Sequence, residues 1–156
     1  MKKDNEIFDL GFYLNRVFAD MVNTVNSMFA NSQISINHSQ FEVLKLLDYI
    51  GGENISQQEI ASIIGRDKAA ISRALTHLEK HGYVKRNALS GSKNGVSLTE
   101  EGKRILPVIN SITAETVKSL CQPISETETR QLVSLLKRIY NNDQNKGKKK
   151  LTSTVC

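Results

Sequence analysis

The sequence predicts a mainly α-helical fold with one small β-hairpin. In several stretches, apolar residues recur every three or four positions, which is the spacing of one face of a helix. Two Ser-x-x-Glu segments, at residues 56–59 and 125–128, match the capping box that begins a helix. Residues 83–98 contain two short β-branched or aromatic runs around a segment rich in Ser, Gly and Asn, a pattern typical of a hairpin. The predicted order is four helices, the hairpin and two further helices.

The first predicted helix covers residues 7–30 and is amphipathic. Its apolar face consists of Leu10, Leu14, Val17, Phe18, Met21, Val25 and Met28. At that length we expect it to extend past the core of its own domain. A second, shorter helix is predicted in SQFEVLKLLDYIGG, where Phe41, Leu44 and Leu47 repeat the spacing and Gly51 with Gly52 favours an end.

Two short helices are predicted next. Ser56 and Glu59 begin a helix that we expect to end at Gly65. Asp67 can cap the following helix, which continues to His81, and Gly82 then stands where a left-handed residue commonly ends a helix. Short helices so close together in the chain predict a helix-turn-helix.

The last two helices follow the hairpin. Thr99 can cap the first of them, and Pro123 ends it. The capping box at Ser125 begins the final helix, whose apolar face consists of Leu132, Leu135, Leu136 and Ile139. Residues 141–156 carry a Lys run without apolar periodicity, so we predict a basic, disordered tail there.

Composition limits the classes of function. The 156 residues suit about one domain, and the net charge of +5 favours a polyanionic partner. That charge is uneven, because residues 66–104 hold nine Lys/Arg against four Asp/Glu. No segment matches a signal peptide or a membrane span, so a cytoplasmic protein without membrane contact is expected. Cys121 and Cys156 lie outside any ligand spacing, and no metal or other cofactor is predicted.

The helix over residues 68–81 has two interpretations, a solvated surface helix and a helix that reads DNA. One face, with Ile71, Ala74, Leu75 and Leu78, suits core packing. The other face combines basic and small residues that could approach base edges or phosphates, namely Lys68, Ala69, Ser72, Arg73 and Thr76. Lys85, Arg86 and Lys93 on the hairpin could contact phosphates beside it. The basic hairpin and the capped short helix together favour DNA binding.

The run SQQEIASIIGRDKAAISRALTHLEKHGYVKR, followed by VSLTEEGK, resembles the winged helix-turn-helix core of the MarR family of bacterial transcriptional regulators. The resemblance implies one domain over residues 1–140, with a winged-helix core at about 37–98 and dimerisation helices at about 7–30 and 100–140. It makes residues 68–81 the recognition helix and 83–98 the wing. The family's wing carries an Asp and an Arg near its tip, whereas NALSGSKNG has Lys93 as its one charge, which predicts a weaker minor-groove contact.

The resemblance implies a homodimer that binds a palindromic operator in double-stranded DNA, most simply as a repressor. It also implies a small aromatic or anionic effector, for which Phe12, Tyr13, Phe18 and Phe41 are candidate contacts, with core packing as the alternative. A dimeric winged-helix module that binds protein or RNA is the alternative function. An enzyme is not predicted, because His38, His77 and His81 belong to no catalytic motif. His77 and His81 suit a solvated helix end better than a metal site.

Overall fold

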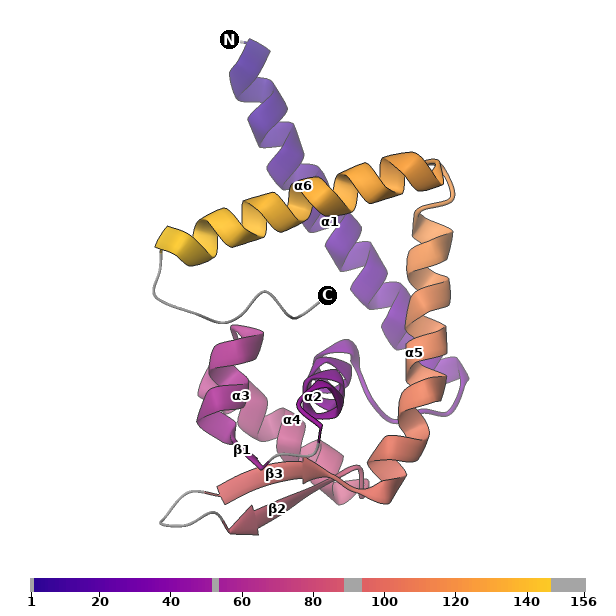
Figure 1. The fold of residues 1–156 in the computed structure, drawn as a ribbon. Coiled ribbons are helices and arrows are strands. Elements are labelled where there is room, and N and C mark those ends of the chain that lie inside the picture. The colour runs from indigo at the N-terminus through magenta and orange to yellow at the C-terminus, as the bar shows by residue number, and fades with distance from the viewer. Residues whose placement is uncertain (1, 52–53, 89–93, 147–156) are drawn as a thin grey trace. The chain divides into compact units, whose positions relative to one another are not determined.

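The computed structural model describes residues 2–51, 54–88 and 94–146 (Figure 1). It divides into two compact units, one up to Val117 and one from Lys118, and each is described by itself. The elements in order are α1 (Lys2–Asn31), α2 (His38–Tyr49), β1 (Ile55–Ser56), α3 (Gln57–Ile64), α4 (Lys68–Lys80), β2 (Val84–Ala88), β3 (Asn94–Leu98), α5 (Glu100–Leu120) and α6 (Glu126–Lys146).

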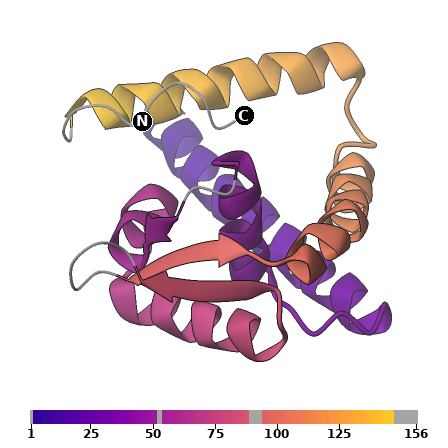
Figure 2. The same cartoon turned by 60° about the horizontal axis from the view of Figure 1, so that its bottom comes forward.

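The mainly helical fold with a hairpin is confirmed, but the sheet has a third strand. β2 and β3 pair antiparallel, with Arg86 opposite Val96, and Figure 2 shows them side by side next to α4. β1 also pairs antiparallel with β3, which gives the order β1-β3-β2. The sequence did not predict β1, because two residues are too few for an alternating pattern.

Local capping explains where the helix-turn-helix begins and ends. The Ser56 hydroxyl accepts from the backbone N–H of Glu59, and the Glu59 carboxylate accepts from the backbone N–H of Ser56, as the capping box predicts. The Asp67 carboxylate likewise accepts from the N–H of Ala70. Gly65 and Gly82 end α3 and α4 with φ of +72° and +73°, the left-handed region that glycine adopts most readily.

The core of the N-terminal unit lies between α2, α3, α4 and the sheet. Its fully buried side chains include Leu44, Leu47, Ile60, Leu75 and Leu78. The carboxyl-terminal part of α1 joins this core through Val25 and Phe29, which are wholly buried. The helical spacing predicted these faces, and their burial is what fixes α4 on the domain.

The amino-terminal part of α1 is different, because its large apolar side chains are exposed within the chain. They are Ile7, Phe8, Leu10, Phe12, Tyr13, Leu14, Val17 and Phe18. The helix also begins earlier than the predicted residue 7, at Lys2. An apolar face of this length is unusual on a helix that has no partner.

In the C-terminal unit, α6 begins at the second capping box. The Glu128 carboxylate accepts from both the N–H and the hydroxyl of Ser125. The predicted tail from residue 141 is wrong in its first part, because α6 continues to Lys146; the remainder, 147–156, lies outside the described residues. The helical propensity of NNDQNK is weak, so the extension had no sequence signal.

Candidate DNA-binding site

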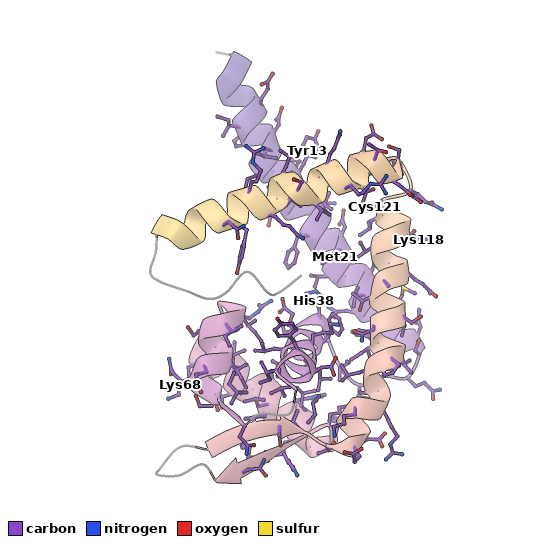
Figure 3. All side chains as sticks on the ribbon, in the orientation of Figure 1. Tyr13, Met21, His38, Lys68, Lys118 and Cys121 are labelled. Carbon is purple, nitrogen blue, oxygen red and sulfur yellow. The ribbon has the colours of Figure 1, made fainter. Side chains whose placement is uncertain are left out.

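The two faces of α4 are separated as the sequence predicts. Ile71, Ala74, Leu75 and Leu78 are buried in the core. Opposite them, Lys68, Ala69, Arg73 and Thr76 are exposed, and Ser72 between them is half-buried. Figure 3 shows Lys68 near the start of the helix. One exposed face therefore combines two cations, two hydroxyls and a methyl group, which are the groups that contact phosphates and major-groove base edges.

The turn before α4 is held from two sides. Gln57 in α3 donates its side-chain amide to the carbonyl of Lys68 at 3.2 Å. Arg66, in the turn itself, pairs with Glu42 of α2, with 3.1 Å between Nη2 and Oε2. The sequence did not reveal this pair, because its members are 24 residues apart. Its effect is to fix the amino-terminal end of α4 relative to α2.

The wing residues are placed differently from one another. Lys85 is exposed on β2 and has no ion pair among the described residues. Arg86 instead lies against α4, where it pairs with Glu79 at 3.2 Å and donates to the hydroxyl of Thr76 at 3.3 Å. Lys93 lies outside the described residues. Lys85 therefore has no ion pair in the described ranges, although after Lys103 it helps to lower the pKa of the nearby Glu100 carboxyl.

The four aromatic residues proposed for an effector do not form one cluster. Phe41 is buried against Phe29, with 6.2 Å between ring centroids. Phe18 meets the ring of His38 edge-on at 5.9 Å, and Phe41 lies 6.1 Å from the same ring. Phe12 and Tyr13 contact each other nearer the start of α1. Core packing thus accounts for Phe41, while Phe18 remains half-exposed beside His38.

His38, which Figure 3 labels, was not predicted as a site residue, yet its ring contacts both Phe18 and Phe41. Its Nδ1 is buried without a hydrogen-bond partner and lies 3.9 Å from the Glu42 carboxylate. Burial lowers the pKa of His38; Glu42 opposes that shift, and Arg66 adds to it. His38 is therefore neutral at neutral pH.

His77 and His81 stack on each other at 4.2 Å near the end of α4. Burial lowers the pKa of His77, and His81 and Lys80 lower it further. Among the residues that the structure covers, no group of three or more His, Cys, Asp or Glu side chains could hold a metal ion. None of the helices in those same ranges combines the length and apolar character needed to cross a membrane.

Comparison with known proteins shows which family part of this chain resembles. Residues 36–93, from α2 through β2, match the family model described as the MarR family. This segment of the chain is similar to the MarR family. The HTH-type transcriptional regulator YdgJ of Bacillus subtilis is 29% identical over 126 residues, which are 80% of this chain and 76% of that protein. A further HTH-type transcriptional regulator, from Bacillus cereus, is 27% identical over 92% of this chain and 96% of its own.

Solved structures of MarR proteins share the fold. A MarR transcriptional regulator from Methanosarcina mazei has a TM-score of 0.78 and 24% identity, covering 90% of this chain and 96% of its own. A mutant MarR from E. coli, complexed with operator DNA, has a TM-score of 0.75 and 25% identity, and the match covers 86% of this chain and 96% of that one. CouR from Rhodococcus jostii, bound to p-coumaroyl-CoA, has a TM-score of 0.72 and 24% identity over 83% and 90%. The MarR resemblance seen in the sequence is therefore confirmed.

Proposed function

We propose that this protein is a MarR-family regulator, which acts in the cytoplasm as a homodimer that binds a palindromic operator and represses transcription. The observation that carries the proposal is the exposed face of α4, with Lys68, Ser72, Arg73 and Thr76 on one side of a helix whose other side is buried. A helix held in this way can enter the major groove and present those side chains to base edges. Lys85 supplies a phosphate contact beside the groove, and Lys93 a second one.

The dimer follows from apolar surface that this chain leaves uncovered. In α1 the exposed fraction is 73% for Phe8 and 56% for Phe12. In α6 it is 52% for Leu135 and 53% for Ile139. Burying such side chains contributes about 1.5–3 kcal/mol each, so a second copy gains much by covering them. Two copies related by a two-fold axis would place two α4 helices in successive major grooves. Repression follows if the operator overlaps a promoter.

A small aromatic or anionic effector is part of the proposal. The solved relative CouR is bound to p-coumaroyl-CoA. In this chain, the half-exposed Phe18 offers an aromatic ring at the junction of α1 and α2, next to the buried His38. A ligand there would contact α1, which carries the exposed apolar face, and α2, whose Glu42 pairs with Arg66. Binding could thereby change the distance between the two α4 helices.

Selection of DNA sequences by the purified protein tests this function. We expect an enriched inverted repeat whose half-sites lie about one helical turn, or 34 Å, apart. Filter binding of the selected duplex and of an RNA duplex with the same sequence, at several salt concentrations, then separates the nucleic acids. The proposal is wrong if no DNA sequence is enriched or if the RNA binds equally well.

A further inference from the structure

Arg86 is held against the last two turns of α4. Its Nη1 lies 3.2 Å from Oε2 of Glu79, and its Nη2 donates to Oγ1 of Thr76 at 3.3 Å. Residues three apart on a helix share a face, so one guanidinium reaches both acceptors. Both terminal nitrogens thus have partners on α4, and the Glu79 carboxylate balances the charge. Arg86 is consequently a poor phosphate contact compared with Lys85.

Thr76 also differs from three threonines inside other helices, although Thr127 at the start of α6 likewise accepts from an arginine, Arg130. Thr24, Thr113 and Thr129 each donate the hydroxyl to the carbonyl four residues earlier, at 2.8 to 3.0 Å. Within the described residues, the hydroxyl of Thr76 takes part in one hydrogen bond, and there it is the acceptor from Arg86. Its own hydrogen therefore has no acceptor in that part of the chain. Thr76 is exposed on the face proposed for DNA.

We propose that Arg86 fixes Thr76 as a hydrogen-bond donor toward DNA, which makes Arg86 a positioning residue for sequence preference. This rests on the proposed function, since Thr76 must face the DNA. A hydroxyl that accepts from a cation is polarised and becomes a stronger donor through its own hydrogen. The acceptors open to it are purine N7, guanine O6, thymine O4 and phosphate oxygens. The amino groups of adenine and cytosine are donors, so they do not satisfy that hydrogen.

The contact has a second effect on geometry. Glu79 and Thr76 are in the carboxyl-terminal half of α4, and Arg86 is in the middle of β2. Arg86 therefore joins the recognition helix to the wing and sets the rotation of the Thr76 side chain. Lys85, the neighbouring residue in β2, is exposed and serves as a matched control for a simple phosphate contact.

The test uses the full-length protein and the selected operator, with Thr76→Val, Thr76→Ser, Arg86→Ala and Lys85→Ala variants. Valine keeps the shape of threonine without the hydroxyl, and serine keeps the hydroxyl. We expect Thr76→Val to weaken operator binding about tenfold, and Thr76→Ser to stay within about threefold of the parent. If purine N7 is the acceptor, replacing the purines of the operator by 7-deazapurines should weaken binding of the parent protein. The same replacement should not weaken binding of Thr76→Val any further. A loss that is equal for all sequences would indicate a phosphate oxygen as the acceptor, and it would overturn the role of Arg86 in sequence preference.

Arg86→Ala should reproduce the loss of preference caused by Thr76→Val while leaving the salt dependence unchanged. The effect of Arg86→Ala on operator affinity should nearly disappear in the Thr76→Val background, because both changes remove the same interaction. Lys85→Ala should instead reduce the log–log salt slope by about one and add to Thr76→Val. Thermal unfolding checks that each variant is folded, and the Thr76 pair decides the donor role even if Arg86→Ala unfolds.

Two further results would overturn this inference without affecting the proposed function. One is a Thr76→Val variant that reads the operator with the parent's affinity and preference. The other is an Arg86→Ala variant that loses about one unit of salt slope and adds fully to Thr76→Val, which is the behaviour of a phosphate contact. A parent protein that selects no duplex sequence would overturn the proposed function and this inference together.

Discussion

Gly102, in the first turn of α5, is a helical glycine that we expect alanine to destabilise rather than stabilise. A Cβ at this position would lie 2.1 Å from the carbonyl oxygen of Tyr83, and that oxygen is held by the N–H of Thr99. Replacing glycine by alanine inside a helix ordinarily stabilises a protein by up to about 1 kcal/mol. Here the backbone must move, so we expect Gly102→Ala to lower the free energy of unfolding by about 3 kcal/mol.

Chemical denaturation measures this effect, and Gly11→Ala is the matched control. Gly11 is also inside a helix, but a Cβ there would meet nothing within 4 Å. We expect that control to stabilise the protein by about 1 kcal/mol. If both variants shift the midpoint in the same direction, the contact between Gly102 and Tyr83 is not a constraint on the fold.

Arg73 is the residue of α4 best suited to read a base pair, because it is exposed and a guanidinium can donate twice to guanine. We expect Arg73→Ala to weaken binding to the selected operator by about 1–3 kcal/mol and to relax the preference at one base pair in each half-site. Its thermal unfolding should match that of the parent. Equal affinity of the variant and the parent at the same salt concentration would remove Arg73 from the reading face.

At the scale of elements, the junction of α1 and α2 contains a group that makes stability depend on pH. Burial lowers the pKa of His38 in the folded protein below the value of about 6.5 expected when unfolded. Between the two values the unfolded chain binds more protons, so stability is lost as the pH falls below about 6.5 and is constant above it. His77 contributes in the same direction, since its pKa is also lowered.

Replacing His38 by Gln should therefore flatten part of this pH dependence. Urea denaturation at pH values from 5 to 8 measures it, and we expect the remaining slope to decrease again when His77→Gln is combined with His38→Gln. If the free energy of unfolding depends on pH in both variants as it does in the parent, other groups are responsible for that dependence. Because neither side chain lies on the exposed face of α4, operator binding at neutral pH should change less than with Arg73→Ala.

The elements were predictable from the sequence where their signals are local. The capping boxes at Ser56 and Ser125 and the glycine after α4 involve residues three or fewer positions apart, so their hydrogen bonds follow from spacing. β1 was not predictable, because its two residues are extended through pairing with β3, about 40 positions later. Local patterns determine helix ends, whereas short strands depend on the tertiary fold.

The same distinction applies to the candidate site. Helical periodicity placed Lys68, Arg73 and Thr76 on one exposed face, as the structure has them. The pairing of Arg86 with Glu79 depends on how the turn after α4 folds β2 back onto the helix, and the sequence suggested a phosphate contact instead. His38 was overlooked because its environment comes from Phe18 and Arg66, on other elements.

At the scale of the whole molecule, the apolar faces of α1 and α6 predict that function requires two copies. A single recognition helix contacts too few base pairs for useful specificity, whereas two on a two-fold axis read a palindrome. Leu136→Asp would place a charge within the apolar face of α6, where the dimer would have to bury it without a partner. We expect this variant to be monomeric or insoluble and to lose specific operator binding.

Light scattering combined with operator titration measures both properties in one sample. Lys137→Asp is the control, because it places the same carboxylate one residue along α6, outside the apolar face formed by Leu132, Leu135, Leu136 and Ile139, and it changes the net charge by two units rather than one. That variant should remain dimeric and bind the operator, with affinity reduced only through the change in net charge. A soluble Leu136→Asp monomer that still prefers the inverted repeat would show that α6 is not part of the dimer interface. Specificity would then have to come from one copy of α4 and its wing, which would predict a single half-site rather than a palindrome in the selected DNA.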